Sequence, residues 1–395
     1  MRRLARRVAE AWEVPRDLLL ARYPAFVTGG PLRRDEVPVF VFHGADPDDF
    51  GRKLRHLADN GYVTLSTDEY VATIRGERAA PERAVLLTFD DGRGSVWSIA
   101  APLLKHHGMK ATVFLVPGRI SSRGPTGPTL EQLEAGRVTG RAELARDEGD
   151  LALMSWQEVE ALARTGLFDF QSHTQLHARI HSAPQLAGFA TPRSRQGYEA
   201  FDQPLVRAGG SDLLGSEVPL GTPLFRSAPR TSETLRFFED EPVRDRCVEL
   251  VAQSGGEGFF LRADWDRRLR NVLRGIRVTG RQETPSEQAQ ALTLELAQSR
   301  RAIEERTGRP VVHLCYPWHA AGPTARRLAA EAGYQTAFCG KVGGVPVTLP
   351  GGNLQQIARL GEDYVELLPG SGRATLAEVL RRKWTRRFGG PAVTS

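Results

Sequence analysis

The feature that most constrains the fold is the alternation of short apolar runs with amphipathic stretches along most of the 395 residues. The runs are rich in branched side chains, as buried strands are, and the stretches repeat apolar residues at helical spacing. The runs that we interpret as strands occupy residues 37–42, 62–65, 84–87, 112–116, 167–171, 311–315, 334–338 and 357–360. Strands that alternate with helices predict an α/β fold with a parallel sheet, either a barrel or a doubly wound sheet.

Helix signals lie between these runs. Ser155 and Glu158 have the spacing of a capping box, and Gly308 follows the longest amphipathic stretch as a helix stop. The helices that we expect cover about 50–58, 67–74, 95–107, 155–164, 285–307, 323–332 and 376–384, with a short one near 130–133 inside a surface loop.

The region 181–284 breaks this rhythm, because it mixes Gly, Pro and polar residues and contains only two predicted helices, 235–254 and 265–274. We interpret it as an insertion that forms a lid or a wall beside the barrel. The expected division is an N-terminal helical extension (1–34), the first part of the barrel (35–180), the insertion (181–284), the second part (285–370) and a basic C-terminal helix and tail (371–395).

Composition excludes several classes of function. The net charge of +6 comes from 53 basic and 47 acidic residues, without an aromatic-interleaved basic repeat or zinc-finger spacing, so we expect no nucleic-acid partner. Three widely spaced cysteines do not form a disulfide framework and are typical of a cytoplasmic protein. The N-terminal arginines are not followed by an apolar run of signal-peptide length.

Two basic segments leave a peripheral membrane contact open as an alternative. Residues 1–22 read as a helix that packs on the protein's own body or lies on a membrane surface. Residues 381–388 combine five basic side chains with Trp384 and Phe388, and they are either a solvated tail or a contact for anionic lipid. The sequence does not indicate an oligomeric state.

Polar clusters follow several predicted strands, at the end where a parallel barrel places its active site. They are His43, Asp90 with Asp91, His173 with His177, Trp318 with His319, and Arg359. Taken alone, each has an ordinary structural explanation. Asp90-Asp91-Gly92 is also a common turn, and a histidine at a strand end is often satisfied by backbone groups.

Together these residues suit metal-dependent hydrolysis. His173 and His177 are separated by three residues, so one loop can bring both imidazoles to a cation, and Asp91 would complete three protein ligands with an open position. Asp90 points in a different direction from its neighbour and could act as general base. A second acid is needed for the leaving group, and histidine is suitable because it titrates near neutral pH.

Three of these segments resemble the motifs of the polysaccharide deacetylases, the NodB-homology or carbohydrate esterase family 4 enzymes. Residues 88–92 (Thr-Phe-Asp-Asp-Gly) resemble the first motif and residues 172–177 the second, His-Ser/Thr-x-x-His. Residues 314–318 resemble the third motif in the Tyr-Pro form of the biofilm poly-N-acetylglucosamine deacetylase branch. The resemblance covers about 35–120, 152–180 and 285–362.

The resemblance implies a distorted (β/α)7-type barrel, here with a long insertion, and hydrolysis of an N-acetyl group from an amino sugar. By motif position, Asp90 would be the base, and Asp91, His173 and His177 would bind a divalent metal. Zinc is the default, with Co²⁺, Ni²⁺, Mn²⁺ and Fe²⁺ as alternatives. In the biofilm branch the leaving-group histidine comes early in the chain, so His43 would be the general acid.

The substrate-side residues implied are Tyr316, Pro317, Trp318, His319 and Arg359. Tyr316 would approach the oxyanion through its backbone, and Trp318 would wall the groove. The third motif lacks the arginine that usually orients the base, and Arg359 is the candidate to replace it. His319 stands where glycine is common, so it is either a second polar group over the substrate or a loop residue.

The substrate itself stays open at this stage. A polysaccharide, a glycolipid and a sugar precursor are all compatible with the motifs. The alternatives are a deformylase or non-sugar amide hydrolase with the same metal site, and a non-catalytic carbohydrate-binding barrel.

Overall fold

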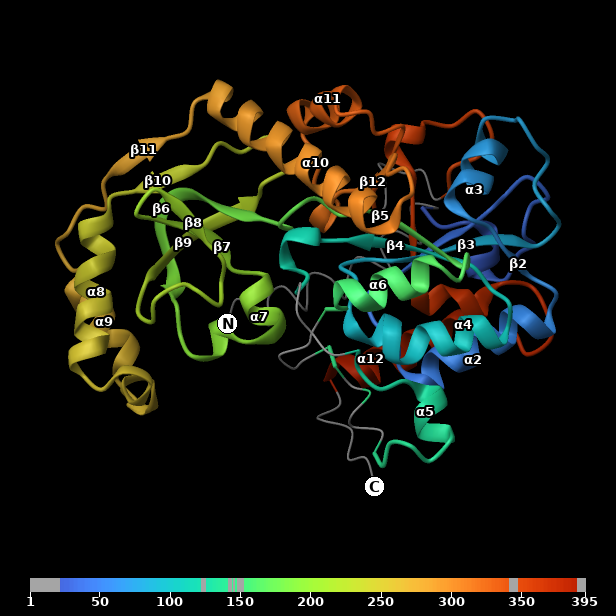
Figure 1. Ribbon diagram of the computed structural model, residues 1–395, viewed down its shortest axis with the longest axis horizontal. Helices are drawn as coiled ribbons and strands as arrows, with labels where there is room; N and C mark the ends of the chain where they lie inside the picture. Colours follow the sequence, from blue (N-terminus) through green and yellow to red (C-terminus); the bar gives the residue numbers. More distant parts are fainter. Residues whose placement is uncertain are drawn as a thin grey trace.

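The computed structural model describes residues 22–121, 126–140, 144, 146, 147, 153–340 and 347–388. Its main body is a barrel of parallel strands surrounded by helices, and a second, smaller body of strands and helices lies to one side of it (Figure 1). The helix expected over 1–22 lies almost wholly outside the described residues, as does the tail that follows residue 388.

Seven strands form the wall of the barrel, in the order β13-β12-β5-β4-β3-β1-β14, and all neighbours in this order are parallel. Their bounds are β1 Val39–Phe42, β3 Ala84–Phe89, β4 Ala111–Leu115, β5 Phe168–Ser172, β12 His313–Cys315, β13 Thr336–Phe338 and β14 Leu360–Gly361, and the short β2 (Val63–Thr64) pairs with the start of β3.

The two edges of this sheet meet at residues 357–361. Leu360 pairs with Phe40 of β1, while Ile357 forms a parallel bridge with Phe338 of β13. The Ile357 N–H donates to the Ala337 carbonyl at 2.9 Å, and the Ile357 carbonyl accepts from Cys339 at 2.9 Å. This short segment therefore closes the sheet, and the predicted distorted (β/α)7-type barrel with a long insertion is confirmed.

The distortion lies between β5 and β12, which share a single register pair, Leu314 with Ser172. On the amino-terminal side of that pair, the Gln171 side chain takes the place of backbone hydrogen bonds between the two strands. Its Oε1 accepts from the backbone N–H groups of Val312 (3.0 Å) and His313 (2.9 Å). The strand predicted from residue 311 therefore begins only at His313.

Helices cover the outside of the barrel: α2 Pro47–Asp59, α3 Thr67–Ile74, α4 Ala101–His106, α5 Leu130–Glu134, α6 Trp156–Ala163, α10 Pro285–Thr307, α11 Pro323–Glu331 and α12 Leu376–Phe388. The capping box expected at Ser155 and Glu158 is present. Gly308 ends α10 in the left-handed conformation with φ 66°. One expected helix is irregular, because residues 96–100 form a π-helical turn before α4.

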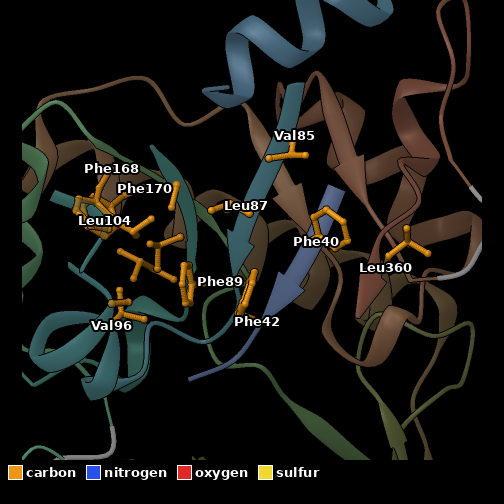
Figure 2. Packing of buried hydrophobic residues seen from close by; sticks show 14 of the residues in the cluster. Phe40, Phe42, Val85, Leu87, Phe89, Val96, Leu104, Phe168, Phe170 and Leu360 are labelled. Atoms are coloured by element: carbon orange, nitrogen blue, oxygen red, sulfur yellow. The ribbon is translucent and has the colours of Figure 1, made fainter. Parts of the chain in front are cut away.

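Side chains alternate between the two faces of the barrel wall. Val85, Leu87 and Phe89 of β3 belong to the large cluster between strands and helices (Figure 2), and Leu86 belongs to a second cluster inside the barrel. Inside, the rings of Phe114 (β4) and Phe338 (β13) lie 5.1 Å apart although their strands are not neighbours. Since the side-chain period of a strand is two residues, Leu86, Thr88 and Asp90 share one face. The fold therefore places Asp90 at the inner rim.

Residues 179–282 form the smaller body. A four-stranded sheet in the order β8-β7-β6-β9 and the pair β10-β11 carry the helices α7, α8 and α9. Their bounds are β6 Arg179–Phe189, α7 Gly197–Phe201, β7 Pro204–Ala208, β8 Ser211–Leu213, β9 Pro223–Pro229, β10 Phe237–Glu239, α8 Glu241–Gln253, α9 Trp265–Val272 and β11 Gly280–Gln282. We call this body the insertion.

The sequence-based view of the insertion was wrong at one boundary. The helix expected from Leu235 begins only at Glu241, because residues 237–239 pair instead with the antiparallel β11. Long-range strand pairing here overrides the local helical pattern.

At the C-terminus, two of the basic side chains have acidic partners within the protein. Arg382 pairs with Glu366 at 2.9 Å and Lys383 with Asp363 at 3.4 Å, which attaches α12 to the turn that follows β14. Among the described helices, none has both the length and the apolar character that crossing a bilayer requires.

Candidate active site

Three loops at the carboxyl ends of β3, β5 and β12 carry the candidate site, and their backbone is strained. Six described non-glycine residues have positive φ, and five of them lie in these loops: Asp91, Thr174, His177, Trp318 and His319. Such conformations cost of order 1–3 kcal/mol each and cluster at functional sites. Next to Asp91, Gly92 has φ 75° and has no room for a side chain, since a Cβ would come within 2.6 Å of Leu115.

Asp90 forms a two-pronged ion pair with Arg359 inside the barrel. The guanidinium donates to Oδ1 at 2.6 Å and to Oδ2 at 2.7 Å, and the Arg359 side chain is fully buried. Burial alone would raise the pKa of Asp90, but Arg359 outweighs it and holds that pKa far below the ordinary range. Asp90 is therefore ionised near neutral pH, and its two oxygens are fixed in direction.

Arg359 thus lies where the expected orienting arginine would lie, paired with Asp90. No part of its side chain is exposed. The same guanidinium donates to the Thr88 hydroxyl at 3.2 Å and lies 2.9 Å from the Cys315 sulfur. Thr88 lies two residues before Asp90 on β3, so the strand and the arginine position the carboxylate together.

Asp91, His173 and His177 form a compact cluster in which one oxygen and two imidazole nitrogens lie within 4.8 Å of one another. Asp91 Oδ1 is 3.6 Å from Nε2 of His173 and 3.7 Å from Nε2 of His177. These separations exceed hydrogen-bond length, while two imidazoles and a carboxylate are a ligand set typical of divalent zinc-type ions. The residues present therefore fit a metal ion.

The electrostatics of the two histidines support this interpretation. Nδ1 of His173 lies 2.8 Å from the Cys315 carbonyl, a contact that places the ring proton on Nδ1. Nε2 therefore carries a lone pair that is free to bind a metal ion. Burial, with His173 as the next cause, lowers the pKa of His177 to about 3. The His177 imidazole is therefore neutral near neutral pH, as a metal ligand must be.

His43 lies beside this cluster. It follows β1 directly, and the Asp90 N–H donates to the Phe42 carbonyl at 2.9 Å, so the ends of β1 and β3 are joined. His43 is exposed, in contrast to the buried aspartates. The electrostatic influence of His43 lowers the pKa of both Asp90 and Asp91, although burial and other partners have larger effects. The structure therefore places His43 in an exposed position near the two carboxylates.

The loop after β12 covers the cluster from another side. Pro317 begins the turn, and the ring of Trp318 lies 4.0 Å from that of His177. The His319 ring occupies the space above Gly340, where a Cβ would come within 2.6 Å of it. The Tyr316 N–H donates to the Phe338 carbonyl at 3.2 Å, so in this conformation it is engaged in the barrel wall and not directed at an oxyanion.

Sequence reasoning missed a contribution from the insertion. Tyr198 of α7 donates a hydrogen bond to Oδ2 of Asp91, and Phe201 lies 4.8 Å from the His177 ring. Arg93, just after the first motif, donates to the Tyr198 hydroxyl at 2.7 Å. No local pattern marks Tyr198, which is 107 residues from its partner in the chain. The helical turn of α7 could be found only from the fold.

Comparison with known proteins agrees with the motifs. The sequence model of the family described as Polysaccharide deacetylase matches residues 77–214, which include Asp90, Asp91, His173 and His177. Over these residues the chain is similar to the polysaccharide deacetylase family. His43 and Arg359 lie outside the matched residues, so their place in the candidate site rests on the structure alone.

Several curated relatives are similar to part of this chain. It is 35% identical over 109 residues to a putative polysaccharide deacetylase, YxkH, of Bacillus subtilis (27% of this chain, 35% of the relative). It is 31% identical over 118 residues to a poly-beta-1,6-N-acetyl-D-glucosamine N-deacetylase of Escherichia coli K12 (30% and 16%). A Staphylococcus epidermidis protein of the same name is 30% identical over 131 residues (33% and 37%). The matches thus span 16–37% of these relatives' own lengths.

Among solved structures, the deacetylase domain of BpsB from Bordetella bronchiseptica matches 84% of this chain and 97% of its own, with a TM-score of 0.49 and 17% identity. IcaB from Ammonifex degensii matches 85% and 97%, with a TM-score of 0.47 and 14% identity.

Proposed function

We propose that this chain is a metal-dependent hydrolase that removes an N-acetyl group from an amino sugar in a polysaccharide, a glycolipid or a sugar precursor. The observation that carries the proposal is the Asp91–His173–His177 cluster, which lies beside an aspartate fixed by Arg359 at the carboxyl end of the barrel. The family match and the names of the relatives support deacetylation as the reaction.

Asp91, His173 and His177 would hold the ion, most simply Zn²⁺. A divalent cation bound by these residues would supply a Lewis acid that acidifies water and polarises the acyl carbonyl. Asp90 then accepts the proton of the attacking water, since Arg359 keeps its carboxylate ionised and aimed.

His43 would complete the reaction by protonating the leaving nitrogen. The C–N bond of the amide breaks, water supplies the oxygen of acetate, and the sugar leaves as an amine. His43 is exposed at the end of β1, the strand beside β3, and histidine is the side chain best suited to donate a proton near neutral pH. Trp318, against the His177 ring, would form one wall of the acetyl pocket.

The test is acetate release from N-acetylglucosamine oligosaccharides after loading with Zn²⁺. We expect Asp90→Asn to lower kcat by about 10²–10⁴-fold, because it removes the proton acceptor at nearly unchanged size. Asp169→Asn is a matched control, because Asp169 lies on β5 at the end away from the site and accepts from Gln171 at 2.8 Å. Equal activity of Asp90→Asn and wild type would exclude the assigned base.

The same assay separates the neighbouring possibilities. Formate release from N-formyl substrates, without acetate release, would indicate a deformylase. If the metal-loaded wild type binds amino-sugar oligosaccharides but releases neither acid, the barrel is a carbohydrate-binding module and the proposal fails.

A further inference from the structure

The insertion reaches into the candidate site through one short helix. α7 (Gly197–Phe201) lies on the side of the insertion next to the barrel (Figure 1). Its two aromatic residues contact the candidate cluster, because Tyr198 donates to Asp91 and Phe201 lies against His177. The rings of Tyr198 and Phe201 are 5.2 Å apart, and Phe201 lies against His177. A continuous row of ring contacts therefore connects Tyr198 through Phe201 to His177, one of the proposed metal ligands.

The two oxygens of Asp91 have different surroundings. Oδ1 faces Nε2 of both histidines and carries no hydrogen bond among the described residues. Oδ2 accepts the Tyr198 hydroxyl and lies 3.5 Å from Nε of Arg93. A tyrosine phenol is protonated near neutral pH and a carboxylate can only accept, so Tyr198 is the donor in this hydrogen bond.

Arg93 in turn fixes the phenol. Its Nε donates to the Tyr198 oxygen at 2.7 Å, and its guanidinium carbon lies 3.6 Å from the centre of the Tyr198 ring. The tyrosine thus accepts from the barrel and donates to the barrel, although it belongs to the insertion. The Tyr198 hydroxyl is therefore held by two hydrogen bonds, one that it accepts from Arg93 and one that it donates to Oδ2 of Asp91.

We propose that Tyr198 is a positioning residue for the metal site: it occupies Oδ2 of Asp91 and so limits this carboxylate to one ligand oxygen. The inference rests on the proposed metal-dependent function. Without the phenol, Oδ2 becomes available as a second ligand oxygen, and the site loses an open position that water or substrate needs. Partners that orient a metal ligand typically contribute about 10–100-fold to metal affinity.

Tyr198→Phe tests this directly, because it removes one oxygen and keeps the ring. Tyr62→Phe is the matched control, since the Tyr62 hydroxyl donates to the Pro369 carbonyl at 2.9 Å and contacts no site residue. Zn²⁺ affinity of each purified full chain is measured by competition with a chelator, and the visible spectrum is recorded after Co²⁺ loading. Co²⁺ absorbs more strongly at lower coordination number, so the spectrum reports the loss or gain of a ligand oxygen.

We expect Tyr198→Phe to weaken Zn²⁺ binding by about 10–100-fold and to change the Co²⁺ absorption, whereas Tyr62→Phe leaves both unchanged. An unchanged affinity and spectrum would overturn the inference. A weaker affinity with an unchanged spectrum would also overturn it, because Tyr198 would then merely hold α7 in place. If the wild type itself binds no metal, the proposed function fails instead, so the two failures are distinguishable.

Discussion

The barrel rim and the base of the insertion each contain a buried arginine–carboxylate pair, and the two pairs have nearly identical contact distances. Arg359 binds Asp90 at 2.6 and 2.7 Å, and Arg230 binds Glu283 with two contacts of 2.7 Å. All four side chains are at most 6% exposed. Their surroundings differ, because Asp90 borders the metal ligands whereas Glu283 accepts from the backbone N–H of Arg236 at 3.0 Å.

This difference shows that the interaction alone does not indicate a role. Arg230 follows β9 and Glu283 follows β11, so their pair joins two strand ends at the base of the insertion. Arg359 lies on the segment that closes the barrel, so its pair fixes a carboxylate at the rim where substrate would enter. The same chemistry is structural in one region and orients a proposed base in the other.

Metal removal should separate the two regions most strongly. We expect a chelator to reduce acetate release to background, because Asp91, His173 and His177 then have no ion to hold, and Zn²⁺ should restore it. Hydrogen exchange of the insertion strands β6 and β9 should not change, since they hold no part of the cluster. Acetate release that persists in protein shown by elemental analysis to be metal-free would contradict this prediction.

The next largest effect is expected from replacing each arginine by methionine. Both Arg359→Met and Arg230→Met leave a buried carboxylate without its partner, which should lower the free energy of unfolding by about 3–5 kcal/mol in each case. Only Arg359→Met should also abolish acetate release per folded molecule. Urea unfolding gives the stability, and the assay is corrected for the folded fraction.

The comparison fails if Arg230→Met loses as much activity per folded molecule as Arg359→Met. Arg359→Lys provides a finer control in the barrel, because it keeps the charge but cannot form both hydrogen bonds to Asp90. We expect it to retain more stability than Arg359→Met while still lowering kcat.

The sequence predicted the barrel better than the insertion, for a physical reason. Barrel strands such as β3 are buried on both faces, so they appear as continuous apolar runs, and their polar residues stand out at the ends. In the insertion, the pairing of β6 with β9 shifts register at three places, and β7 and β8 are short and partly exposed. Such strands have neither a continuous apolar run nor a clean alternation.

The candidate site divides in the same way. Asp90, Asp91, His173 and His177 were predictable because each lies in a short motif after a strand. Arg359 was predictable only as a residue near the end of the last strand, since its ion pair spans 269 positions of the chain. Tyr198 was not predictable, because no motif near it in the sequence indicates a hydrogen bond to Asp91, which is 107 residues away in the chain.

The smallest expected effect concerns a second ion pair of the insertion, in which His181 Nδ1 lies 3.0 Å from Glu239 Oε2. Burial alone would raise the pKa of Glu239, but the hydrogen bond with His181 outweighs it and lowers that pKa below its ordinary 4.5. A carboxyl whose pKa is lower in the folded state stabilises the fold above its unfolded pKa, and this stability is lost as the pH falls through the folded value. Acidification below 4.5 should therefore loosen β6 and β10 before it affects Asp90, whose pKa is held far lower. Hydrogen exchange of these strands measures the change.

Glu239→Gln should lower the free energy of unfolding by about 1–2 kcal/mol at neutral pH and remove the acid-dependent loosening of β6 and β10. An acid-dependent step of the same size in this variant would assign the loosening to another group.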